Sequence, residues 1–252
     1  MTPNPDDATM FDDAWFERQV YTEEYGGCLQ QQADILKEYY HHQKTTLQAA
    51  TELARSVEEL HASPASRAQL YVLLSDALIE WPEDTVGDLV ALLATIQERD
   101  TLIEGKSVWH GLPSFANQWH DGNHADPPLW RDDQVGLEGD ARAALIEKQR
   151  RVAKAECCLV NAGVGQIQLS WGFDTVCDAL ESEDAILDVE VPMANEWLQL
   201  CESQFRAAAS ARTQHRALRR QNGGMGEPEM SFDRLRGWWE RLRELQHADT
   251  SK

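Results

Sequence analysis

Apolar residues recur every three or four positions along most of this chain, the spacing that places them on one face of an α-helix. Residues 29–61 keep this spacing without a proline or a glycine, so they are expected to form one long helix. Ser63 and Pro64 begin a second helix that ends before Pro82, and Pro82 suits the first turn of a third helix. Because the connections are short, neighbouring helices are expected to run antiparallel.

The second half of the chain continues the helical pattern. One helix is expected from Leu137 to the glycine-containing break at residues 163–165. Residues 167–173 alternate apolar and polar positions as a strand would, but a lone strand would have no partner, so a helix is favoured. Pro192 is expected in the first turn of a long helix reaching toward Gln221, and Ser231 suits the N-cap of the last helix.

The stretch from Gly105 to Gly136 has no sustained period and is rich in tryptophan and proline. A connection of this length is uncommon in a compact domain unless it is functional or disordered, and its indoles argue against disorder. The sequence therefore predicts an all-α fold, a single-domain bundle of mainly antiparallel helices with one long aromatic connection. The domain is expected to cover residues 27–246, between an N-terminal segment at 1–26 and a disordered tail at 247–252.

Charge and cysteine content narrow the possible partners and the location. The chain carries 23 basic and 43 acidic residues, a formal net charge of −20 at pH 7. Such a surface repels phosphate backbones and anionic lipids, so neither nucleic acid nor a membrane is expected as a partner. Five cysteines in helical patterns, with no basic or long apolar segment at the N-terminus, predict a reduced, cytoplasmic protein.

Histidines in the aromatic connection are the candidate catalytic groups. His110 and His120 are expected to act as general acid or base, because imidazole titrates near neutral pH and neighbouring indoles exclude water. With Asp121, His124 and Asp126 they also offer ligand types that zinc accepts. The stretch is not expected to be helical, so its histidines do not form a helical HxxxH or HExxH site, and no metal site is expected.

Large aromatic rings are the candidate lining of a substrate pocket, since they shape apolar cavities and exclude water. The alternative is that the rings only wedge the long connection onto the bundle. The rings expected in the pocket are Trp109, Phe115, Trp119, Trp130, Trp171 and Trp197. The glycine-rich residues 223–226 lack the Lys-Ser or Lys-Thr that completes a P-loop, and no cofactor is expected.

Arginines gather near the C-terminal end of an otherwise acidic chain. Arg212, Arg216, Arg219 and Arg220 are expected to complement the end of a helix and to pair with the acidic body. A site for an anion or for a protein partner is the alternative.

Four motifs, in order, resemble those of a large family of uncharacterised filamentous-fungal proteins. They are R-x-Q-L-Y-V-L-L-S-D-A-L-I at residues 67–79, W-x-x-L-P-x-F followed by a tryptophan at 109–119, L-D-V-E-V-P-M-A-N-E-W-L at 187–198 and S-F-D-R-L-R-G-W-W-E-R-L at 231–242. The resemblance covers roughly residues 25–245. It implies an all-helical intracellular protein, with some relatives encoded near natural-product pathways, and implies no reaction or catalytic residues.

Two functions are consistent with these features. The first is a cofactor-independent enzyme of fungal specialised metabolism that holds a hydrophobic small molecule in an aromatic pocket and promotes its cyclisation, isomerisation or dehydration. The second is a non-catalytic helical module that binds another protein, or a second copy of itself. An enclosed aromatic cavity would favour the enzyme, and a solid core with an exposed apolar groove would favour the module.

Overall fold

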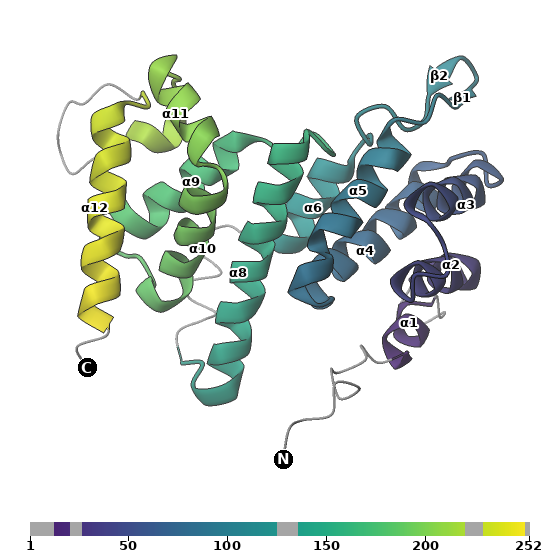
Figure 1. The fold of residues 1–252 in the computed structure, drawn as a ribbon, viewed down its shortest axis with the longest axis horizontal. Helices are drawn as coiled ribbons and strands as arrows, with labels where there is room; N and C mark the ends of the chain where they lie inside the picture. Colours follow the sequence, from purple (N-terminus) through teal and green to yellow (C-terminus); the bar gives the residue numbers. More distant parts are fainter. Residues whose placement is uncertain (1–12, 21–26, 125–135, 220–228, 250–252) are drawn as a thin grey trace. The chain divides into compact units, whose positions relative to one another are not determined.

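The computed structural model describes residues 13–20, 27–124, 136–219 and 229–249 (Figure 1). These residues are mostly α-helical, and β1 (Leu102–Ile103) and β2 (Lys106–Ser107) form one short hairpin among them. The predicted all-α class is therefore confirmed. The chain divides into two compact units. The first unit comprises residues 1–123 with 164–166, and the second comprises residues 124–163 with 167–252.

The first unit is built around a central helix. α3 lies against both α2 and α5, and α4 lies against α5 and α6. The elements are α1 (Ala14–Gln19), α2 (Gln30–Tyr40), α3 (Thr46–Glu58), α4 (Pro64–Glu80), a 3₁₀ turn (Glu83–Thr85), α5 (Val86–Gln97), the hairpin strands β1 (Leu102–Ile103) and β2 (Lys106–Ser107), and α6 (Phe115–Asn123). The helix α6 and the hairpin fall in and beside the stretch that the sequence predicts as an irregular connection.

The single helix predicted over residues 29–61 is wrong, because the structure contains two helices there. Between α2 and α3, His42 adopts a left-handed backbone conformation with φ 56°. The Thr45 hydroxyl then accepts a hydrogen bond from the Gln48 backbone N–H at 3.3 Å, and the Gln48 side chain accepts one from the Thr45 backbone N–H at 2.9 Å. This reciprocal capping box starts a new helix although the apolar spacing continues across the break.

The N-terminal segment contributes to the packing of the first unit. Trp15 of α1 is buried against Trp81, with ring centroids 5.7 Å apart. Its indole N–H donates to Glu80 Oε2 at 2.7 Å, so α1 is attached to the unit by both apolar and polar contacts.

In the second unit, α10 lies against both α8 and α9 (Figure 1). The elements are α8 (Gly139–Ala162), α9 (Leu169–Glu181), α10 (Leu187–Leu200), α11 (Glu202–Ser210), a 3₁₀ turn (Arg216–Arg219) and α12 (Phe232–Asp249). The sequence favours a helix over a strand after residue 167, and α9 confirms this prediction. Ser231 is confirmed as a cap of α12, because its hydroxyl accepts from the Arg234 backbone N–H at 3.2 Å.

The long helix predicted from Pro192 toward Gln221 is wrong at both ends. α10 begins at Leu187, so Pro192 lies inside it, and the helix stops at Leu200 before α11 begins. At this break the Asn161 side chain of α8 donates to the Leu200 carbonyl at 2.9 Å. A side chain distant in sequence thus satisfies a carbonyl at the helix end, where no intrahelical partner exists.

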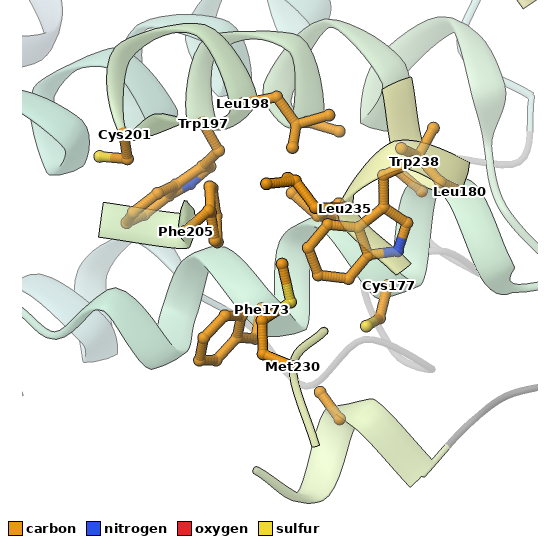
Figure 2. Packing of buried hydrophobic residues seen from close by; sticks show 14 of the residues in the cluster. Phe173, Cys177, Leu180, Trp197, Leu198, Cys201, Phe205, Met230, Leu235 and Trp238 are labelled. Carbon is orange, nitrogen blue, oxygen red and sulfur yellow. The ribbon is translucent and has the colours of Figure 1, made fainter. Parts of the chain in front are cut away.

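Aromatic rings dominate the core of the second unit. Figure 2 shows Trp197, Phe205, Phe173 and Trp238 packed together with aliphatic and sulfur-containing side chains. Phe205 lies centrally, with its ring centroid 5.6 Å from that of Phe173 and 5.9 Å from that of Trp238. These separations are typical of favourable aromatic pairs.

Candidate functional site

A histidine and a buried glutamate form a pair in the second unit. His124 Nε2 is in direct contact with Glu156 Oε1, and Glu156 comes from the buried face of α8. The Glu156 side chain is fully buried, whereas 23% of the His124 side chain is exposed. Trp171 of α9 lies beside the imidazole, with ring centroids 5.4 Å apart. The pair therefore has a carboxylate on its inner side and an indole next to the ring.

The surroundings of His124 favour its protonated form. Burial alone would lower the pKa of His124, but the charge of Glu156, the hydrogen bond to Glu156 and the charge of Asp174 raise it above its ordinary value. A buried carboxylate stabilises the imidazolium and orients the ring, as a carboxylate does for many catalytic histidines. A histidine that exchanges a proton is the group that general acid–base catalysis most often uses.

The two histidines predicted as catalytic residues lie elsewhere, in the first unit. His110 is exposed directly after the hairpin. His120 is on α6 with 53% of its side chain exposed, and its Nδ1 is 3.8 Å from Asp121 Oδ1. Both histidines occupy exposed positions, and their catalytic role stays a prediction.

Large side chains in the described part of the aromatic connection pack inward. The buried side chains include Trp109, Leu112, Phe115 and Trp119. The ring centroid of Phe115 lies 6.1 Å from that of Trp119 and 5.4 Å from that of Tyr71. These rings contact one another directly, so within the first unit they form part of the packed core.

Glu58 fixes the position of this connection. Its Oε1 accepts hydrogen bonds from the Trp109 indole at 2.8 Å and from the Thr101 hydroxyl at 2.9 Å, and Arg99 Nη2 is 3.3 Å away. Burial raises the pKa of Glu58, but these donors outweigh burial and hold the pKa below its usual range. Trp109 is therefore held by a charged acceptor as well as by packing.

The remaining predicted pocket residues are divided between the second unit and an undescribed segment. Trp197 is fully buried, and its ring centroid is 6.5 Å from that of Phe205. Trp171 is partly buried and adjoins His124, so it is the predicted pocket ring that contacts the histidine–glutamate pair. Trp130 lies outside the described residues.

The candidate metal ligands lie only partly within the described residues. Within the ranges that the structure describes, no group of three or more His, Cys, Asp and Glu side chains could hold a metal ion. Asp126, one of the candidate ligands, lies outside those ranges.

Sequence reasoning missed Glu156, although a signal was present. Glu156 occupies the buried stripe of α8, between Val152 and Leu159 and directly before Cys157. A charged residue inside an apolar helical stripe requires a partner, because an unpaired buried charge is costly. The sequence could not identify that partner as His124, which is 32 residues away.

Comparisons with known proteins identify the family of this chain. The curated proteins and the solved structures contain no match to this chain. No helix in the described part of the chain has the length and apolar character needed to cross a membrane. A family model described as a protein of unknown function, DUF3632, matches residues 71–242. The match includes the aromatic connection, the His124–Glu156 pair and most of α12, and the chain belongs to the DUF3632 family.

Proposed function

We propose that this protein is a cofactor-independent enzyme that transfers a proton to or from a hydrophobic small molecule, with His124 as the general acid or base. The observation that supports this proposal is the contact between the partly exposed His124 imidazole and the fully buried Glu156 carboxylate. A histidine on the protein surface would pair with a hydrated carboxylate or with no carboxylate at all. Burial of the carboxylate strengthens its effect on the imidazole.

Trp171 supports the apolar character of the substrate. Its indole adjoins the imidazole and is partly buried, so a ligand reaching His124 would meet an aromatic surface as well as a titrating group. Isomerisation, dehydration and proton-initiated cyclisation each need one positioned proton donor or acceptor, together with a surface that excludes water. We place the reaction in fungal specialised metabolism on the strength of the sequence motifs.

The test uses extracts of the organism that encodes the chain. Untargeted mass spectrometry first identifies a metabolite that is lost on deletion of the gene, and purified protein is then added to the deletion extract. We expect wild-type protein to restore formation of the metabolite. His124→Gln should reduce the initial rate by about 10²–10⁴-fold, because it removes the titrating group.

His247→Gln is the matched control, since it makes the same change at an exposed histidine in the last turn of α12. Its rate should stay within about twofold of wild type, because surface substitutions rarely disturb a site they do not contact. Melting temperatures of both variants show whether a loss of rate comes from unfolding. Full activity of a folded His124→Gln protein would contradict the proposal.

A non-catalytic module that binds another protein is the second candidate. Its support is the solid packing of Trp109, Trp119 and Trp197, together with the exposed side chain of Leu47 beside a hollow of about 300 Å³ on α3. Exposed apolar side chains beside a depression are common at protein interfaces. If deletion of the gene changes no metabolite, this candidate replaces the enzyme.

A further inference from the structure

An open hollow of about 530 Å³ lies where the end of α9 meets the first turns of α12. Its size is within the range of sites that bind small molecules. Gly237 lines the hollow, and a Cβ added there would meet no atom within 4 Å. A bound molecule could therefore approach the helix backbone at this position.

The floor of the hollow is a buried ion pair. Arg234 donates to both carboxylate oxygens of Glu181, at 2.8 and 2.7 Å, and the Trp238 indole donates to the same carboxylate at 2.6 Å. Figure 2 shows Trp238 beside Leu180 and Leu235, which join this floor to the apolar core. The two parallel hydrogen bonds and the apolar packing make the floor rigid. The pairing of the Arg234 and Glu181 charges makes it electrically neutral.

Within the part of the chain that the structure describes, two further arginines of the hollow keep hydrogen-bond donors that no protein group uses, and the remaining charged side chain of the lining, Asp233, pairs with Arg236. Arg212 pairs with Glu229 through Nε and Nη2. Arg241 contacts Glu244 through Nη1, at 3.3 Å. A guanidinium has five N–H donors, so Arg212 keeps its Nη1 donors and Arg241 keeps those of Nε and Nη2. Their side chains are 71% and 49% exposed, so an incoming ligand can reach them.

We propose that this hollow binds a small organic molecule that carries an oxyanion group, a carboxylate or a phosphate. The oxyanion is held between Arg212 and Arg241, and the body of the molecule lies over Gly237. Guanidinium groups suit both oxyanions, because their planar N–H forks match the two oxygens. The hollow uses none of the residues assigned to proton transfer, so this proposal does not depend on the enzymatic one.

Citrate and inorganic phosphate are the two probes, each titrated into the full-length protein by isothermal calorimetry at low salt. We expect saturable binding of at least one probe. Citrate alone indicates a carboxylate site, phosphate alone a phosphate site, and both together a general oxyanion site. Absence of binding by both probes at 10 mM, roughly a hundredfold above a Kd of 0.1 mM, would overturn the proposal.

Variants separate this site from general attraction of anions. Arg241→Gln should weaken binding about tenfold or more, the usual effect of removing a charged hydrogen-bond donor. Arg243→Gln, an exposed arginine on the same helix that does not line the hollow, should change the Kd less than about twofold. Equal weakening by both changes would overturn the proposal.

Gly237→Leu is the second variant, because it fills the hollow and leaves its charges unchanged. It should also weaken binding about tenfold, since the leucine side chain would occupy the space above the helix backbone. Binding unaffected by this change would place the anion elsewhere and overturn the proposal. His124→Gln should leave the Kd unchanged, which keeps this result separate from the enzymatic test.

Discussion

Replacing Trp109 by alanine is expected to lower the free energy of unfolding by about 3–5 kcal/mol, the usual cost of deleting a buried tryptophan ring. The ring is fully buried, and its indole N–H donates to Glu58 at 2.8 Å. The substitution therefore removes apolar contacts and also takes one donor from a carboxylate held by three residues. Urea denaturation followed by circular dichroism measures the loss.

Two further variants show which part of the loss comes from packing. Trp109→Phe keeps an aromatic ring but removes the N–H, so it should cost less than the alanine variant, with about 1–3 kcal/mol from the weakened hydrogen bonding of Glu58. Leu102→Ala changes an exposed residue of the neighbouring hairpin, 64% exposed, and should cost under about 0.5 kcal/mol. A loss below about 1 kcal/mol in Trp109→Ala would contradict the inward packing of the connection.

Gly172→Ala is expected to lower the stability of the second unit by about 1–3 kcal/mol through overpacking. A Cβ at this position would lie 2.5 Å from the Trp197 ring, closer than real Cβ contacts allow. Trp197 is fully buried, so the ring has little room to move. The steric cost should therefore exceed the gain of about 0.5–1 kcal/mol that alanine normally brings to a helix.

Gly237→Ala is the matched control for this change, because it makes the same substitution in a helix where the Cβ would meet no atom within 4 Å. It should raise the free energy of unfolding by about 0.4–1 kcal/mol. The two alanine variants are thus expected to shift the urea midpoint in opposite directions. A shift to higher stability in both would show that Trp197 is not packed against Gly172.

Local signals in the sequence predicted much of the fold. Ser63 and Ser231 mark helix starts that the structure confirms, and their hydroxyls accept the capping hydrogen bonds. The break between α2 and α3 also had a local signal, the Thr45–Gln48 capping box, but continuous apolar spacing concealed it. The break after Leu200 could not be predicted, because it is accompanied by a hydrogen bond from Asn161 on another helix.

The candidate site was harder to predict, because its parts are distant in sequence. Tryptophan density directed attention to His110 and His120, whereas the structure assembles His124 with Glu156 and Trp171. Glu156 stood out only as a charge within an apolar stripe. Helical periodicity places Glu156 in that stripe but cannot identify its partner, because periodicity describes one helix at a time.

The central claim, that Glu156 makes His124 a stronger proton acceptor, is tested most directly by an NMR titration of the His124 imidazole. Loss of a signal in His124→Gln assigns the resonance. The expected pKa of His124 lies above the ordinary value of 6.5. The contribution of the His124–Glu156 pair to the free energy of unfolding is therefore complete below pH 6.5, and it is lost as the pH rises through the raised pKa. In Glu156→Gln, with folding verified by circular dichroism, the pKa should fall. A wild-type pKa at or below 6.5, or a pKa that does not change in Glu156→Gln, would contradict the account.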